Sequence, residues 1–382
     1  MPITQRKERD LRIDFFRGLA LIFIFIDHVP DNSWASLTLR NFGFADASEV
    51  FVLLAGYSAG LAYWSTIDRG GFQAAFNRAS RRASEIYIWH LGVFIASAIL
   101  LYAASRIFNN ADYVNHVAIN GFTTDPTGTV LSALALFYQP NQMNILPMYV
   151  VLMFWLPFVI VLLRKSVAMT LAISFAIWAI ANVAGLNLPT HQRAEGWFFN
   201  PFAWQLLFTT GAAVAVLARR MPEERPDSPL LIPAALYVVF AFLVTAPWMQ
   251  WSLLPKVQLI SRDVVEPMSK HDLSAWRFAH VLALAYLTAI YVPSNAAWLK
   301  KSWAVSIQAC GKHSLEIFSL GTLLSFFGWI ALTELGTSQT MMLMVNVIGI
   351  TIMGVTAWQM ARRKQSRVSS RPRQRPAEAL AT

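Results

Sequence analysis

Long apolar segments recur along this chain, and their length constrains the fold more than any other feature. A helix needs about 20 residues to cross the roughly 30 Å hydrocarbon core of a bilayer. Inside lipid every backbone polar group has to be bonded within its own segment, so such segments fold as helices. We delimit ten of them, at 13–29, 44–64, 86–105, 145–163, 167–184, 199–218, 230–249, 275–292, 307–331 and 339–360. The sequence therefore predicts an all-α, polytopic membrane helix bundle with about ten transmembrane helices.

The composition excludes an ordinary soluble protein and disfavours metal chemistry. The chain has 382 residues, of which 56% are hydrophobic and only 14% are charged, and its mean hydropathy is +0.45. Cys310 is the single cysteine, so an internal disulfide or a multi-cysteine metal site cannot form. The histidines are scattered, with no His-x3-His pair on a predicted helix. We expect no metal and no tightly bound cofactor.

The basic residues predict how the bundle is oriented. Cytoplasmic loops carry an excess of lysine and arginine. With ten spans, most of the 31 basic residues lie on the side of the two termini, which we take as cytoplasmic. The net charge of +10 thus reflects topology rather than a nucleic-acid partner. The basic residues placed on the opposite side are Arg40, Arg106, Arg193, Lys256, Arg262, Lys270 and Arg277.

We divide the chain into one membrane domain, 1–361, and a basic tail, 362–382. The tail, RRKQSRVSSRPRQRPAEALAT, is polar and is expected to be disordered in the cytoplasm. The first apolar run lacks a small-x-small cleavage site, so we interpret it as an uncleaved span. A shorter apolar piece, 129–139, cannot span a bilayer and is expected to be re-entrant or interfacial. Long outer loops, which are often functional, favour work on the outer face.

The first span, within RIDFFRGLALIFIFIDHVP, carries ionisable residues along one stripe. Arg17 and His28 are separated by about 20° around the helix axis and by roughly 16 Å along it, and Asp14 lies within about 40° of His28. Ionisable residues within a span are functional candidates by default. The alternative is that Arg17 snorkels to the interface and His28 lies among outer headgroups. We therefore consider Asp14, Arg17 and His28 as candidate site residues.

Two carboxylates lie at the predicted depth of His28. Glu49, at the outer end of the second span, could fix the imidazole tautomer and raise its basicity. Its alternative is an interfacial residue exposed to water. Asp27 faces about 100° away from His28 and could orient it only if the helix bends before Pro30. We include Glu49 and Asp27 with His28 in the candidate catalytic set.

A second cluster is basic and lies on the cytoplasmic side. Arg78, Arg81 and Arg82 fall where the third span begins, in FNRASRRASEIYIWH, and Lys312 falls near the inner end of the ninth. The positive-inside rule alone accounts for them. The sharper hypothesis is a clamp for a phosphate-bearing cytoplasmic donor, because arginine binds phosphate with two parallel hydrogen bonds.

These motifs resemble those of the acyltransferase-3 superfamily of membrane acyltransferases. The resemblance lies in the Arg-x10-His pattern of Arg17 and His28, in SEVFVLLAGYSAG and in the arginine-rich RASRRASEIY. The pairing of DFFRGLALIFIFIDH with ASEVFVLLAGYSAGLAY is closer to the OpgC branch. The departures are Glu49, where many relatives have aspartate, and GKHSLEIFSLGT, which lacks the aromatic-x-x-His ending common in the superfamily.

The resemblance implies a reaction. A member of the OpgC branch would sit in the bacterial inner membrane and succinylate osmoregulated periplasmic glucans. His28 would be catalytic, and Arg17 would help to hold acyl-CoA, either succinyl-CoA or acetyl-CoA, as donor substrate. His28 would act as a general base or through an acyl-imidazole relay. A succinyl carboxylate would need a cation, and Arg40, Arg262 or Lys270 are open choices on the outer side.

Two other functions stay open. The first is O-acetyl transfer to another envelope glycan, which would use the same residues. The second is a transporter or exporter without chemistry, which would need charge spread through the middle of several helices. The sequence instead concentrates charge at the ends of the first three spans, which favours a site open to both sides.

Overall fold

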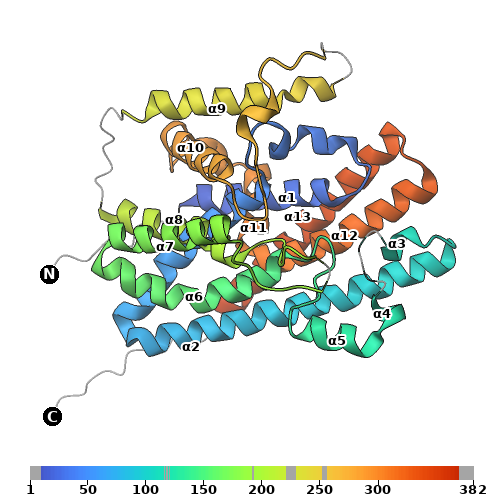
Figure 1. The fold of residues 1–382 in the computed structure, drawn as a ribbon, viewed down its shortest axis with the longest axis horizontal. Helices are drawn as coiled ribbons and strands as arrows, with labels where there is room; N and C mark the ends of the chain where they lie inside the picture. The colour runs from blue at the N-terminus through green and yellow to red at the C-terminus, as the bar shows by residue number, and fades with distance from the viewer. Residues whose placement is uncertain are drawn as a thin grey trace.

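A computed structural model describes residues 10–115, 117, 119, 121–191, 193–220, 229–251 and 256–369. The described residues form helices and turns and contain no β-strand (Figure 1). The longer helices are α1 Leu11–His28, α2 Ala47–Ile107, α6 Ile145–Lys165, α7 Val167–Ala184, α8 Pro201–Arg220, α9 Leu231–Thr245, α10 Ala275–Tyr291, α11 Ser302–Lys312, α12 Ser314–Leu335 and α13 Gln339–Ser369. The short α3 Asp112–Asn115, α4 Gly121–Thr124 and α5 Pro126–Leu134 follow α2.

Seven of the described helices are long and apolar enough to cross a membrane: α2, α6, α7, α8, α9 with the turn that follows it, α12 and α13. This confirms an all-helical fold of membrane type. The count of ten spans stays a prediction. Helix α1 covers the first predicted span but carries charged side chains, and α10 covers the eighth but is only 17 residues long.

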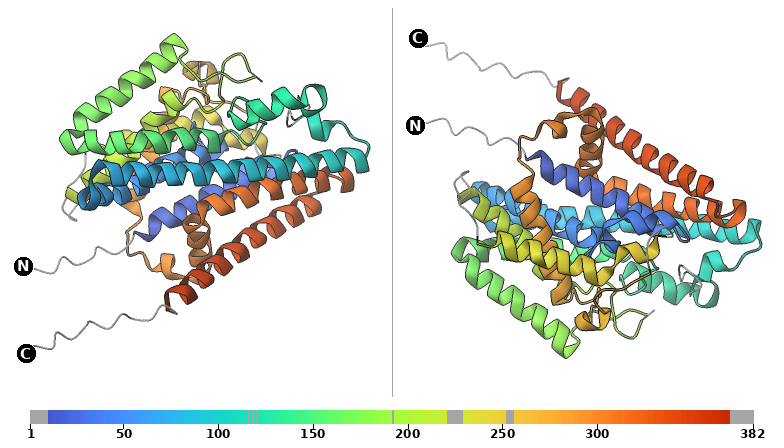
Figure 2. Two further views of the ribbon diagram at one scale, coloured as in Figure 1. Left: turned by 90° about the horizontal axis from the view of Figure 1, so that it is seen from below. Right: turned by 90° about the horizontal axis from the view of Figure 1, so that it is seen from above.

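The second and third predicted spans lie on two helical arms that meet at a sharp kink rather than at a long loop. Helix α2 has 61 residues and is helical throughout except at Gly71, where φ is 69° and the chain turns back on itself (Figure 2). The expected inner loop is helical because its sequence is rich in alanine and arginine and contains no proline. Glycine suits the break because it adopts positive φ without a steric penalty. The arm after the bend is roughly 54 Å long, well beyond the bilayer core.

The ninth predicted span, 307–331, is interrupted in the structure. Helix α11 ends at Lys312, His313 adopts φ −110° and ψ 43°, and α12 begins at Ser314. Figure 2 shows α11 running across the direction of α12 and α13. Helix α11 packs closely on α1: a Cβ on Gly311 would overlap the backbone oxygen of Asp14 in α1, and a Cβ on Gly18 would overlap that of Ile307. The two helices therefore cross backbone to backbone.

Small residues bring α2 and α8 together in the same way. A Cβ on Gly56 would overlap the Phe208 backbone, one on Gly60 would meet Ala212, and one on Gly211 would overlap the Leu53 backbone. Glycines therefore form this helix contact, since small residues let membrane helices approach closely.

The two ends of the bundle differ. The bend of α2, the α6–α7 junction and the described ends of α1 and α13 nearest the termini lie at one end, and α3 to α5 lie at the other (Figure 2). The apolar piece 129–139 begins inside α5, which is a short helix. Helix α13 continues to Ser369, past the predicted start of the tail at 362, because the alanine, arginines, lysine and glutamine there favour a helix. Residues 370–382 lie outside the described residues.

Candidate functional site

The candidate stripe on α1 faces the bundle. Asp10 begins the helix by accepting a hydrogen bond from the Arg12 backbone. Asp14, Arg17, Leu21 and Ile24 are all buried. The residues of the predicted stripe that precede His28 therefore lie inside the protein.

Arg17 lies inside the protein rather than at the interface. Its side chain is only 9% exposed, and its Nη2 donates hydrogen bonds to the backbone oxygen of Leu54, at 2.7 Å, and to the hydroxyl of Ser58. Both partners belong to α2. Arg17 therefore ties α1 to α2 and does not snorkel out of the bundle.

Tyr149 is a further polar side chain in this region, and sequence reasoning missed it. Its ring packs edge-on against Phe51 of α2, and its phenol interacts electrostatically with Arg17. The hydroxyl is buried and has no hydrogen-bond partner among the described residues. A tyrosine near the start of an apolar segment gives no signal of its own, because such residues are common in interfacial belts.

Asp14 and Lys312 are neighbours through the α1–α11 crossing. Asp14 is buried, and its backbone lies against Gly311, the residue before Lys312. The Lys312 side chain is exposed. The structure thus brings these two predicted residues to the same helix crossing, one turn from Arg17.

His28 ends α1 and presents an imidazole that is free to react. Its backbone oxygen accepts a hydrogen bond of 2.9 Å from Nε2 of Gln142. Its Nδ1 is buried, and neither ring nitrogen has a hydrogen-bond partner among the described residues. Arg40, Asp46 and Lys270 lie within electrostatic range of the ring.

Asp27 points to another partner. Its Oδ1 accepts a hydrogen bond of 2.6 Å from the hydroxyl of Thr38, which is 1% exposed. Thr38 precedes the short turn η2, Leu39–Asn41. Asp27 therefore fastens the outer loop to α1 and does not orient the His28 ring, as the 100° offset predicts.

Glu49 does not pair with His28, which corrects the sequence interpretation. Its carboxylate is fully buried, accepts a hydrogen bond of 2.7 Å from Arg277 Nε, and accepts another of 2.9 Å from the backbone of Asp46. Asp46 in turn caps the backbone of Ser48. The two acids form a capping box at the start of α2. A buried carboxylate takes a cation where one is within reach, and Arg277 of α10 supplies it.

Asp46 forms ion pairs with two cations at the start of α2. Arg277 Nη2 lies 3.1 Å from its Oδ2, and Lys270 Nζ lies 2.5 Å from the same oxygen. Sequence reasoning did not place Arg277 or Lys270 beside Asp46, because more than 220 residues separate them along the chain. The D-x-x-E spacing before an apolar run was the one local signal, and it indicates a cap.

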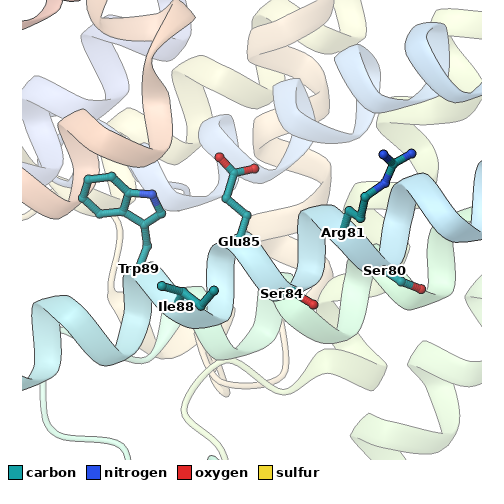
Figure 3. A pocket seen from close by; sticks show the side chains of 6 residues that line it. All are labelled: Ser80, Arg81, Ser84, Glu85, Ile88 and Trp89. Atoms are coloured by element: carbon teal, nitrogen blue, oxygen red, sulfur yellow. The ribbon is translucent and has the colours of Figure 1, made fainter.

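The arginines on the second arm of α2 have separate partners and do not converge on one position. Arg78 donates to the backbone oxygen of Ala62 and to Thr66 on the first arm of the hairpin, and Arg82 pairs with Glu85 at 2.6 Å. Arg81 lines a shallow, open pocket of about 410 Å³. Figure 3 shows that Arg81, Glu85 and Trp89 project from one stretch of the helix, with Ser80, Ser84 and Ile88 beside them. The phosphate clamp stays a prediction.

No group of three or more His, Cys, Asp or Glu side chains in the described part of the chain is placed to hold a metal ion.

Comparison with known proteins places the chain in a family. The family model described as OpgC protein matches residues 9–365, which is nearly the whole sequence. Neither the curated proteins nor the solved structures contain a significant match. The matched region includes the α1 stripe, the capping box of α2 and Arg277 of α10. The chain belongs to the OpgC protein family.

Proposed function

We propose that this protein is a membrane-embedded O-acyltransferase that moves a succinyl group from cytoplasmic acyl-CoA to hydroxyls of periplasmic glucan. In this proposal the protein spans the bacterial inner membrane with both termini in the cytoplasm. The family match supports transfer to glucan, and the long apolar helices support a membrane location. The superfamily resemblance of the α1 and α2 motifs supports acyl-CoA as the donor.

One observation carries the proposal. Helix α1 holds a buried guanidinium, Arg17, in the interior of the bundle and an imidazole, His28, at its outer end, with buried Leu21 and Ile24 between them on the same face. The imidazole has no hydrogen-bond partner among the described residues, so it is available to take a proton. A cation and a base on one inward stripe fit a donor that enters from one side and an acceptor that enters from the other.

The proposed reaction uses His28 as a general base. The neutral imidazole of His28 takes the proton of a sugar hydroxyl. At the same time the oxygen of that hydroxyl attacks the thioester carbonyl carbon. The carbon–sulfur bond then breaks, and the CoA thiolate leaves and recovers the proton from the imidazolium. Such a base contributes roughly 10²–10⁴ in rate. An acyl-imidazole relay, in which His28 is acylated first, is the other course open to the same residue.

The donor would be held from the cytoplasmic side. Arg17 and the Tyr149 hydroxyl would bind polar groups of the pantetheine arm within the bundle. Asp14 and Lys312 would lie beside the arm at the α1–α11 crossing. Arg78, Arg81 and Arg82 would bind CoA phosphates, which requires Arg78 and Arg82 to exchange their present partners for the ligand.

The test is purified protein in proteoliposomes that carry acyl-CoA on the inner side and a glucan oligosaccharide outside. We expect His28→Ala to insert normally and to transfer no acyl group, whereas His191→Ala, an exposed outer histidine, keeps parental activity. Transfer by His28→Ala at a near-parental rate would refute the catalytic assignment. Mass spectrometry of the glucan separates succinyl transfer from its rival, acetyl transfer, and an unmodified glucan with parental protein would support a transporter.

A further inference from the structure

The turn that carries Arg40 is docked on the end of α1 that carries His28. Arg40 is the middle residue of η2, Leu39–Asn41. Thr38, which immediately precedes this turn, is buried and donates its hydroxyl to Asp27, the residue next to His28. The Asn41 amide also bonds back to the Ala35 backbone oxygen, which closes the loop on itself. These contacts hold the backbone on either side of Arg40 against the end of α1 that carries His28.

Arg40 is the outer cation near His28 that the protein leaves available. Lys270 is also within electrostatic range of the imidazole, but it is ion-paired with Asp46 at 2.5 Å. Arg262 donates a hydrogen bond of 3.1 Å to the Thr245 backbone oxygen at the end of α9, so it is already engaged on another element. Arg40 is exposed, and among the described residues it has neither a hydrogen bond nor an ion pair within 4.0 Å.

The chemistry of a dicarboxylic acyl group matches this arrangement. When the carbonyl carbon of a succinyl group is at the reacting position, its free carboxylate lies about 4 Å further along the chain. A guanidinium binds a carboxylate through two parallel, charge-assisted hydrogen bonds. An uncharged acyl group of the same length has no carboxylate to accept the two guanidinium hydrogen bonds. The cation would therefore discriminate between donors by the carboxylate alone.

We propose that Arg40 is a specificity-determining residue that binds the free carboxylate of a dicarboxylic acyl donor while the acyl carbon lies at His28. The inference rests on the proposed acyl transfer and adds the reason for choosing succinyl over an uncharged group. Asp27 keeps its hydrogen bond with Thr38. The carboxylate of the incoming acyl group then has the Arg40 guanidinium as its binding partner. Arg40 does not take part in bond making.

The experiment measures donor selectivity of the full-length protein in proteoliposomes with two probes, succinyl-CoA and butyryl-CoA, which have acyl chains of equal length. We expect Arg40→Gln to lower kcat/KM for succinyl-CoA by roughly 10- to 100-fold, the range for one charge-assisted hydrogen-bonded contact. Transfer from butyryl-CoA should stay within about twofold of parental protein. Arg40→Lys should restore much of the preference, because it returns the charge.

Arg262→Gln is the matched control, since it removes an exposed arginine from the same side of the bundle, and it should leave both donors unaffected. An equal loss with both donors in Arg40→Gln would show a structural role and overturn the inference, as would unchanged selectivity. Parental protein that transfers butyryl but not succinyl would overturn selection by Arg40 and leave acyl transfer at His28 standing. Parental protein that transfers neither acyl group would overturn both proposals.

Discussion

At the scale of single residues, the site is defined by which polar groups are bound and which are not. Arg17 and Glu49 are buried and each has partners on another element, whereas the His28 imidazole has none among the described residues. Buried charges persist in proteins when they are paired and hydrogen-bonded. The His28 imidazole, which has no such partner, is therefore not committed to a structural bond.

Substitution of Arg17 should weaken use of the donor more than the chemical step. We expect Arg17→Ala to raise the KM for acyl-CoA by roughly 10- to 100-fold, because a buried guanidinium forms charge-assisted hydrogen bonds. Initial rates over a range of donor concentrations measure this. Arg69→Ala is the control, since Arg69 is exposed and bonds only to the backbone of its own helix. An unchanged KM in Arg17→Ala would show that Arg17 only joins α1 to α2.

Substitution of Glu49 should cost stability, because Arg277 would lose a buried carboxylate. We expect Glu49→Gln to lower the free energy of unfolding by roughly 1–3 kcal/mol. The same change at Glu85, which is about half-exposed and pairs with Arg82 on the same helix, should cost less than about 1 kcal/mol. Thermal unfolding in detergent compares the two variants. Equal shifts in midpoint would contradict a special role for the Glu49–Arg277 pair.

The sequence alone predicted the residues of the α1 stripe but not the residues from other helices that surround the site. Asp14, Arg17, Leu21 and Ile24 could be placed on one face because the helical period is fixed. The true partner of Glu49 could not be found, because Arg277 lies 228 positions away and nothing in one sequence states which helices are neighbours. Local chemistry was more informative: the D-x-x-E pattern of Asp46 and Glu49 indicates a cap, and a cap leaves Glu49 unable to serve His28.

At the scale of helices, the apolar segments predicted where helices lie along the sequence but not where a helix is interrupted. Hydropathy located the arms of α2 but not the helix that joins them through a single bend at Gly71. It also merged α11 with α12, because an apolar pattern does not reveal that Gly311 must pack on the α1 backbone. Both errors concern where a helix breaks: at Gly71 in α2 and at His313 between α11 and α12, and hydropathy marks neither position.

The α1–α11 crossing should tolerate no side chain at Gly311. We expect Gly311→Ala to destabilise the protein by roughly 1–3 kcal/mol, because the added Cβ overlaps the Asp14 backbone oxygen. Gly354→Ala on α13 is the control, since a Cβ there meets no atom within 4 Å. Thermal unfolding in detergent gives both values. Gly311→Ala with parental stability would mean that the helices do not touch at this point.

At the scale of the whole molecule, the arrangement of the bundle fits a protein that works on two aqueous sides. The described ends of α1 and α13 nearest the termini lie at one end, and the loop of Arg40, the capping box of α2 and the cations Lys270 and Arg277 gather around the other end of α1. Charge distribution in the sequence predicted this polarity. It could not supply the number of spans that cross the membrane, since length and composition qualify seven of the described helices.

Cysteine labelling tests the ten-span topology. In a variant with Cys310 replaced by alanine, we expect Ser166→Cys, at the α6–α7 junction, to react with a membrane-impermeant maleimide only after the membrane is opened. Gly185→Cys, at the end of α7, and Ser338→Cys, between α12 and α13, should react in intact spheroplasts. The pattern follows from ten spans with cytoplasmic termini. Reaction of Ser166→Cys in intact spheroplasts would reverse the assigned orientation of α6 and α7.

Helix α1 is anchored near both of its ends. Near its beginning it lies backbone to backbone with α11, and beyond its end Asn32 exchanges amide hydrogen bonds of 2.9 and 3.0 Å with Asn346 of α13. Translation of α1 along its own axis would break one of these attachments. Helix α1, which carries Arg17 and His28, is therefore held in place by α11 and α13, and its two functional candidates keep a fixed separation along it.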